Sequence, residues 1–163
     1  MPPIISIIIP VYNCEYTLAD SLESTLSQSL SDIEIICVND ASRDASFEIL
    51  KYYRRQDARI RIINQEHLGA AVARNRGITT ASGRFLFFLD ADDFFPDRDV
   101  LLDLYNAATE SRSKIAGGSF CTFSQRRNRT VKTFQEPFDG YVFPGDGLVF
   151  YEDYQFDLGF QRF

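Results

Sequence analysis

The segment RFLFFLDADD, residues Arg84–Asp93, joins a run of bulky apolar side chains to three carboxylates. Its apolar half, Phe85–Leu89, is short and unbroken, which is typical of a strand that is buried on both faces of a sheet. The acids Asp90, Asp92 and Asp93 then follow the carboxyl end of that strand. In open α/β sheets this edge is where ligands bind, so the segment predicts both a buried strand and a ligand site.

The spacing of these acids favours a metal site. Side chains two residues apart on an extended chain point the same way, so we expect Asp90 and Asp92 to face one point and Asp93 to face elsewhere. Adjacent carboxylates repel unless a cation lies between them, and Mg²⁺ or Mn²⁺ binds one or two carboxylates together with substrate phosphates. The alternative is a solvated loop or a helix cap, which is the interpretation we favour for Asp93.

Outward from this segment, apolar runs alternate with helical patterns. Ile4–Ile9 and Ile33–Val38 predict buried strands, the first ending at Pro10, and Arg59–Ile63 alternates as a short strand near the sheet edge does. Leucines at positions 18, 22, 26 and 30 recur on one helical face, and further helices are expected at residues 47–55, 69–80 and 100–111. This alternation predicts an α/β domain with a mostly parallel central sheet and helices on both faces.

Composition narrows the class of protein. The chain has 163 residues, 45% of them hydrophobic, which suits one folded domain, and its net charge of −6 argues against a nucleic-acid surface. Cys14, Cys37 and Cys121 fit no metal spacing and are expected to be free thiols in a reducing compartment. No apolar run reaches membrane-spanning length and no signal peptide is recognised, so a cytoplasmic location is expected, with peripheral association at the inner membrane face as an alternative.

Three strand-end loops are expected to meet at one edge of the sheet: Pro10–Glu15, Asn39–Ser42 and Asp90–Asp93. An aromatic or proline face can pack on a nucleobase, and carboxylate or amide oxygens can accept hydrogen bonds from base N–H groups and ribose hydroxyls. The chain has no G-x-G-x-x-G after its first strand and no G-x-x-x-x-G-K-[ST]. Phosphates would therefore be neutralised by a metal and arginine rather than by a glycine-rich loop.

Four segments together resemble the nucleotide-sugar-binding part of the family-2 inverting glycosyltransferases of bacterial cell-envelope type. They are ISIIIPVYNCEYTL, IEIICVNDASRDAS, HLGAAVARNRG and GRFLFFLDADD, and they span about the first two thirds of the chain. The resemblance implies the GT-A fold, a Rossmann-like three-layer sandwich. It also implies transfer of a sugar, with inversion, from a nucleoside-diphosphate sugar to a saccharide or lipid-linked acceptor in polysaccharide synthesis. A UDP-sugar is the favoured donor, and Mn²⁺ or Mg²⁺ is the implied cofactor.

The same resemblance implies roles for individual residues. Those that would surround the nucleotide are Pro10, Tyr12, Asn13, Glu15, Asp40, Arg74 and Asp90. Asp92 would be the closer metal ligand, with Asp90 a second ligand nearer the ribose. Asp40 would meet the base, although the preceding residue is Asn39 where the family usually has aspartate. Local roles stay open beside these: Pro10 ends a strand, Tyr12 belongs to the core, Arg74 pairs with a nearby carboxylate, and His67 serves a turn.

The C-terminal third carries a predicted β-hairpin and a candidate catalytic base. Ser119–Phe123 and Thr130–Phe134 predict a β-hairpin around a basic tip at residues 126–129, followed by an aromatic tail. Asp153 is the candidate catalytic base, because the resemblance implies a carboxylate in a late Glu-Asp-like motif. The surrounding segment resembles instead the stretch that precedes the base, so we expect the base beyond Phe163 and the chain to be truncated. We expect a single domain, with residues 1–115 binding the donor and 116–163 beginning the acceptor side.

Two function classes are alternatives to a glycosyltransferase. A non-catalytic nucleotide-sugar-binding module would keep the pocket and lack a base. A haloacid-dehalogenase-like phosphatase is disfavoured, because the first strand carries no D-x-D and Asp90-Ala91-Asp92 is not followed by threonine or valine.

Overall fold

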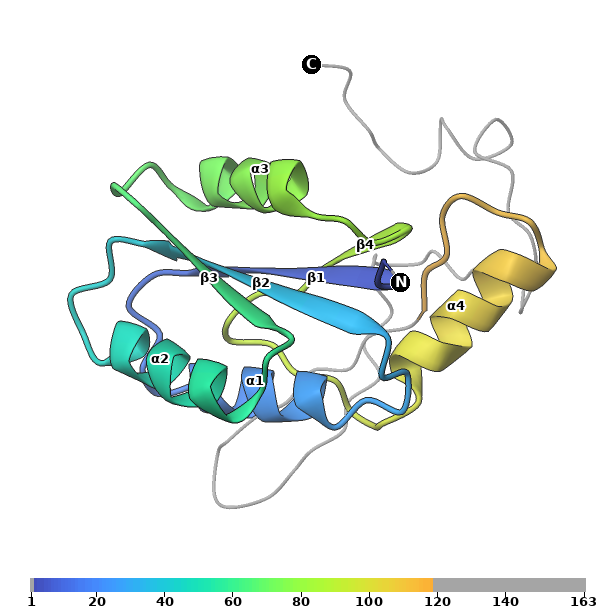
Figure 1. The fold of residues 1–163 in the computed structure, drawn as a ribbon, viewed down its shortest axis with the longest axis horizontal. Helices are drawn as coiled ribbons and strands as arrows, with labels where there is room; N and C mark the ends of the chain where they lie inside the picture. Colours follow the sequence, from blue (N-terminus) through green and yellow to red (C-terminus); the bar gives the residue numbers. More distant parts are fainter. Residues whose placement is uncertain (1, 119–163) are drawn as a thin grey trace, which may run out of the picture. The chain divides into compact units, whose positions relative to one another are not determined.

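The structure is a computed structural model, and it describes residues 2–118. The strands, all parallel, form one sheet in the order β3-β2-β1-β4. They are β1 (Ile5–Val11), β2 (Ile33–Asp40), β3 (Ile60–Gln65) and β4 (Phe85–Phe88). The helices that alternate with them are α1 (Leu18–Leu26), α2 (Ser46–Gln56), α3 (Ala70–Thr80) and α4 (Val100–Glu110). Helix α3 covers one face of the sheet and α1 and α2 cover the other (Figure 1). The expected parallel α/β sandwich is confirmed.

The chain divides into two compact units between Asp103 and Leu104. The sheet and its strand-end loops belong to the first unit. The predicted hairpin, its basic tip, the aromatic tail and Asp153 lie outside the described residues. Within residues 2–118, no helix combines the length and the apolar content that crossing a membrane requires.

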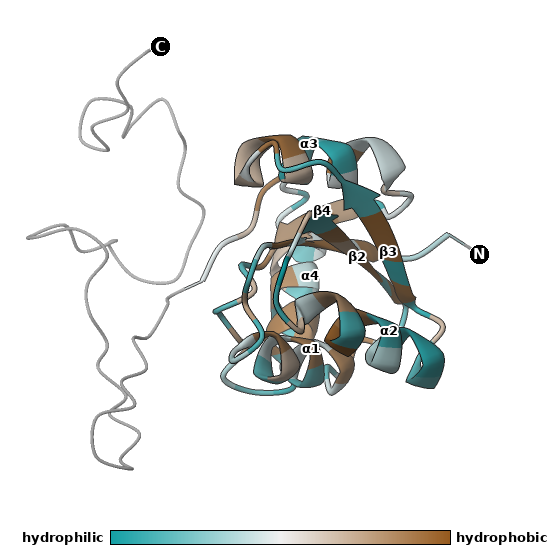
Figure 2. Ribbon diagram, turned by 90° about the vertical axis from the view of Figure 1, so that its left-hand side faces the viewer, coloured by the Kyte–Doolittle hydropathy of each residue, from teal (hydrophilic) through white to brown (hydrophobic). Residues whose placement is uncertain are grey.

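The core lies where the two central strands meet the helix layers. All of β2 is buried, and β1 is buried except at the half-buried Pro10. The hydrophobic residues concentrate on the sheet between the helices (Figure 2). On the α3 side the helix approaches closely through Gly77, since a Cβ added there would lie 2.4 Å from Ile8 Cγ2. On the opposite side Leu18 and Leu22 of α1 are fully buried.

The prediction that the first strand ends at Pro10 is wrong, because β1 continues to Val11. Residues of even number in β1 turn their main-chain groups toward β4, as the hydrogen bond from Leu89 N–H to the Ile8 carbonyl shows. Pairing with β4 ends at Ile8 and Phe88, so no ladder bond requires an N–H from Pro10. A proline is tolerated in a strand where its missing donor faces no partner.

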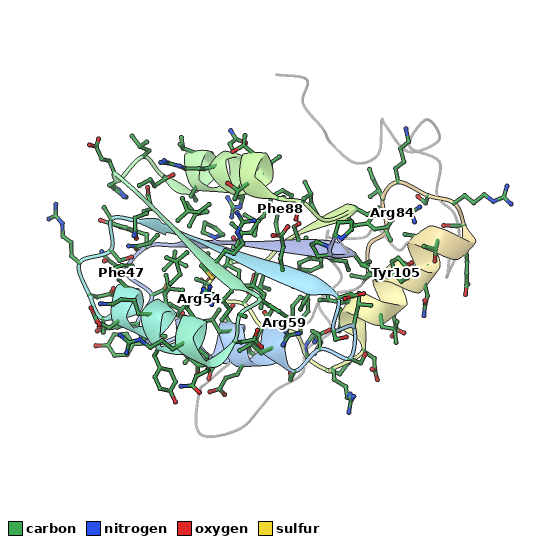
Figure 3. All side chains as sticks on the ribbon, in the orientation of Figure 1. Phe47, Arg54, Arg59, Arg84, Phe88 and Tyr105 are labelled. Atoms are coloured by element: carbon green, nitrogen blue, oxygen red, sulfur yellow. The ribbon has the colours of Figure 1, made fainter. Side chains whose placement is uncertain are left out.

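Strand β4 is not buried on both faces within the described part of the chain. Its exposure alternates, with Leu86 43% and Phe88 45% exposed (Phe88 is labelled in Figure 3), whereas Phe87 packs on Phe95 with ring centroids 5.1 Å apart. The reason is position: β4 is an edge strand of the described sheet, and α3 packs over β1 and β2. The apolar run identified a strand but not its place in the sheet.

A buried ionic cluster ties the strands together near their amino ends. Glu34 of β2 accepts hydrogen bonds from the Ser6 hydroxyl at 2.6 Å, the Ser82 N–H at 2.6 Å and hydroxyl at 2.8 Å, and Arg61 Nη1 at 3.0 Å. Burial alone would raise the pKa of Glu34, but these donors outweigh it and lower that pKa to about 2. The cluster links β1, β2 and β3 to the segment that leads into β4, at the edge opposite the strand-end loops.

Candidate functional site

The loops that follow the parallel strands gather at one edge of the sheet, as the alternating pattern predicts. Hydrogen bonds fasten the first two loops to each other. Asn13 donates its main-chain N–H to Ser42 Oγ at 3.2 Å, and its side-chain Oδ1 accepts the Arg43 N–H at 2.8 Å. Asn13 adopts the left-handed conformation, with φ of 49°. Asparagine tolerates this region better than most residues, which suits it to this turn.

Glu15, two residues after Asn13, makes the same kind of paired hydrogen bonds with the loop after β2. Its main-chain N–H donates to Asp44 Oδ2 at 3.0 Å, and its Oε2 accepts the Ala45 N–H at 2.8 Å. Burial would raise the pKa of Asp44, but hydrogen bonds, that from Ser46 the largest, lower it below its ordinary value. Asn13 and Glu15 therefore hold the loop after β2 in this structure, and their contact with a nucleotide stays a prediction.

The second loop contains a strained residue. Ala41 has φ of 58°, a conformation that costs an L-residue other than glycine roughly 1–2 kcal/mol. Glycine removes this strain but loses more backbone freedom on folding, which costs roughly 0.5–1 kcal/mol. We expect Ala41→Gly to raise the free energy of unfolding by about 0.5 kcal/mol in urea denaturation. Ala41→Val is the control and should lower it; a destabilised glycine variant would contradict the strain.

Asp40, at the end of β2, is 2% exposed and organises the loop after β3. Its Oδ1 accepts Gln65 Nε2 at 2.7 Å and the Leu68 N–H at 2.8 Å. Its Oδ2 accepts the Gly69 N–H at 2.9 Å and lies 2.9 Å from His67 Nδ1. Burial would raise the pKa of Asp40, but the three hydrogen bonds, that from Gln65 the largest, and the charge of His67 lower it below its ordinary value. The carboxylate is thus ionised and fully engaged.

Tyr12 lies at the same edge, 45% exposed, and is therefore not a core residue. Its ring stacks on the His67 imidazole with centroids 4.0 Å apart and planes 24° from parallel. The sequence pattern assigned His67 only a turn role. The available signal was that His67 is the only histidine in the chain and follows a strand that ends at the same edge.

Arg74 of α3 forms an ion pair with Asp90 after β4. Asp90 is thus the nearby carboxylate that the alternative role of Arg74 required. The ion pair places the Arg74 guanidinium beside the acidic segment. The side chains are 35% and 47% exposed, so both remain accessible to a ligand. A phosphate and a metal would compete for these two groups, since each is charged and partly solvated.

The acidic segment is a turn rather than an extended chain. Pairing ends with β4 at Phe88, and the Asp93 N–H donates to the Asp90 carbonyl at 3.0 Å. Asp90 and Asp92 were expected to face one point because side chains alternate along an extended chain. The turn removes that reason, since these residues are not in an extended strand. Burial, then the charges of Asp92 and Asp90, raise the pKa of Asp93. The acids are thus close enough to repel one another.

The donor set suits a hard cation that completes its shell with ligand oxygens. No hydrogen bond or ion pair engages the Asp92 carboxylate within residues 2–118, and that side chain is exposed. Nor does this part of the chain bring three or more His, Cys, Asp or Glu side chains together so that they alone could hold a metal ion. Mg²⁺ and Mn²⁺ need only one or two carboxylates when substrate phosphates and water supply the rest. Asp92 and Asp90 therefore fit such a site, and the metal assignment stays a prediction.

Comparison with known proteins extends these observations. Over 121 residues the chain is 40% identical to glycosyltransferase GlyA of Streptococcus pneumoniae, covering 74% of this chain and 17% of GlyA. Over 131 residues it is 41% identical to the uncharacterized glycosyltransferase EpsJ of Bacillus subtilis, covering 80% of this chain and 38% of EpsJ. The chain thus spans less than half the length of these relatives.

Solved structures share the fold, which is GT-A. S. aureus TarS 1–349 in complex with UDP-GlcNAc matches with a TM-score of 0.62 and 28% identity, covering 69% of this chain and 32% of that chain. The mannosyltransferase PcManGT of Pyrobaculum calidifontis, in complex with GDP-Man and Mn²⁺, matches with a TM-score of 0.62 and 23% identity, covering 78% and 37%. A family model described as glycosyl transferase family 2 matches residues 6–158. With nearly its whole length matched, the chain belongs to glycosyl transferase family 2.

Proposed function

We propose that this chain binds a nucleoside-diphosphate sugar and is the donor-binding part of an inverting glycosyltransferase of cell-envelope polysaccharide synthesis. The observation that carries the proposal is the single sheet edge that presents an exposed aromatic ring, a buried carboxylate and an arginine beside two acids. These are Tyr12, Asp40, and Arg74 with Asp90 and Asp92. A nucleobase can use the ring and the buried carboxylate, and a ribose and a diphosphate can use the arginine and the two acids.

Each group has a defined task in this proposal. The Tyr12 ring packs on the base, and the Asp40 carboxylate accepts a base N–H. Arg74 neutralises phosphate charge and Asp90 lies nearest the ribose. Asp92 and Asp90 would hold Mn²⁺ or Mg²⁺, which as a Lewis acid stabilises the charge of the departing diphosphate. The acceptor hydroxyl also requires a base, for which Asp153 is the candidate in this chain.

The relatives support this choice of ligand. The S. aureus TarS structures include complexes with UDP and with UDP-GlcNAc, and PcManGT is in complex with GDP-Man and Mn²⁺. Because the chain is more similar in sequence to TarS, uridine is the base we propose. The acceptor is proposed to be a saccharide or a lipid-linked saccharide.

A thermal-shift screen of UDP, GDP and ADP, each with and without Mn²⁺, tests the proposal. A ligand at a hundred times its dissociation constant stabilises the folded state by about 2.7 kcal/mol, which for this size raises the melting temperature by about 5–10 °C. We expect that rise with UDP and Mn²⁺ and a smaller one without metal. The absence of a shift with every nucleotide would overturn the proposal. Donor binding without release of UDP in a transfer assay would favour the non-catalytic module.

A further inference from the structure

In this structure a side chain already occupies the position that the proposed function gives to the nucleobase. The His67 imidazole stacks on Tyr12 with centroids 4.0 Å apart, and its Nδ1 lies 2.9 Å from Asp40 Oδ2. Nδ1 also lies 3.3 Å from the main-chain carbonyl oxygen of Asp40, which is its hydrogen-bond partner. Because both oxygens only accept, Nδ1 is the ring nitrogen that carries the proton. A flat ring that stacks on the tyrosine and holds a ring N–H against the Asp40 carboxylate thus occupies the position proposed for the nucleobase.

The carboxylate has no further capacity while His67 is in place. A carboxylate offers about four acceptor positions. Asp40 accepts three hydrogen bonds, from Gln65, Leu68 and Gly69, and its Oδ2 is also in close ionic contact with His67 Nδ1. Two of the donors are the main-chain N–H groups of Leu68 and Gly69, just before α3, and their positions are set by the backbone. The third belongs to Gln65, which is only 8% exposed. The fourth neighbour of the carboxylate is His67, whose side chain is 55% exposed, so it is the neighbour that solvent or a ligand can most easily replace.

A second acceptor beside Asp40 points to a missing donor. Gln65 Oε1 is buried and has no hydrogen-bond partner among the described residues. The amide cannot be turned around to satisfy it, because Gln65 Nε2 must face the acceptor-only Asp40. A buried acceptor without a partner is uncommon, and a bound water, ion or ligand can supply the donor that it lacks.

We propose that His67 occupies the nucleobase position in the ligand-free protein, and that a nucleotide binds by displacing the imidazole from Tyr12 and Asp40. This inference rests on the proposed function and adds a residue that sets nucleotide affinity. Binding then includes the loss of the ring stack on Tyr12 and of the close contact between His67 Nδ1 and the Asp40 carboxylate. Removing the imidazole should therefore tighten binding, whereas a residue that merely supports Tyr12 would weaken binding when removed.

Isothermal titration calorimetry of the 163-residue chain with UDP, in Mn²⁺ and in EDTA, tests this inference. Aromatic pairs and partly exposed ion pairs together predict about tenfold tighter UDP binding by His67→Ala. His67→Phe keeps a ring for stacking but has no N–H for Asp40, so its affinity should lie between the two. Glu66→Gln, an exposed change in the same loop, is the control and should bind like the wild type.

A second measurement follows the imidazole itself. His67 is the only histidine, so its ring resonances are assigned without ambiguity in a histidine-labelled sample. In the free protein its ring protons should be shifted upfield by the Tyr12 ring, and UDP should return them to solvent-exposed values. Ring resonances that stay unchanged at saturating UDP would overturn the displacement even if a variant failed to fold.

The outcomes separate this inference from the proposed function. If the wild type binds UDP and His67→Ala binds equally or more weakly, the displacement is wrong and the proposed function stands. If His67→Ala binds and the wild type does so only weakly, both are supported. If neither protein binds any nucleoside diphosphate, both are overturned.

Discussion

Replacing Asp92 with alanine is expected to abolish the contribution of Mn²⁺ to UDP binding. Asp90 is already paired with Arg74, so Asp92 is the exposed carboxylate on which a cation site at this turn depends. Without it, only Asp90 of the proposed ligand pair remains, and because that carboxylate is paired with Arg74, the metal has no uncommitted ligand of the pair to hold it beside the diphosphate. Calorimetry should show that Asp92→Ala binds UDP in Mn²⁺ no better than the wild type binds UDP in EDTA.

The fold should be unaffected, because exposed substitutions usually change stability by no more than about 0.5 kcal/mol. Asp32→Ala is a matched control: it removes an exposed aspartate that precedes β2, at the opposite edge of the sheet. That variant should keep the full effect of Mn²⁺. Undiminished Mn²⁺-dependent binding by Asp92→Ala, with the control behaving as expected, would remove Asp92 from the metal site.

The largest expected effect on stability is that of Glu34→Gln. The glutamate is 8% exposed, and its pKa is lowered from 4.5 to about 2 by the serine and Arg61 donors that outweigh its burial. A shift of this size corresponds to roughly 3 kcal/mol of stability. The variant leaves Arg61 without its carboxylate partner, and we expect the free energy of unfolding at pH 7 to fall by about 3 kcal/mol.

This loss should depend on pH in a defined direction. Because the folded-state pKa of Glu34 is lowered, its contribution is complete above about pH 4.5 and disappears as the pH falls toward 2. The difference between wild type and variant in urea denaturation should therefore shrink between pH 5 and pH 2. Glu48→Gln is the control, because Glu48 pairs with Lys51 at the surface and should cost less than about 0.5 kcal/mol. A difference that does not change with pH would contradict the ionised cluster.

The order of the elements could be predicted from the sequence because unbroken β-branched runs and helical spacing are local signals. The helices at residues 46–56, 70–80 and 100–110 lie within one residue of the expected ranges. The first helix ends at Leu26, and Leu30 is buried without belonging to it. Apolar spacing reports burial, and a residue in the following loop can be buried as well.

The sequence was less informative about the site, because its contacts join loops that are distant in the chain. Which strand lies at the sheet edge depends on the order of pairing, and this left Leu86 and Phe88 exposed where burial was expected. The turn at Asp90–Asp93 depends on where pairing ends. The stack of Tyr12 on His67 depends on two loop conformations at once, so spacing carries no signal for it.

The fastening of the first two loops has a consequence for redesign. Asn13 and Glu15 accept hydrogen bonds from the main chain at positions 43 and 45, so the side chains at those two positions take no part in these bonds. Chemical groups can be varied there, beside the ligand edge, while the scaffold that aligns them keeps its geometry. In this short loop, the side chains at positions 43 and 45 can thus be changed while the main-chain hydrogen bonds at the same positions keep the loop in place.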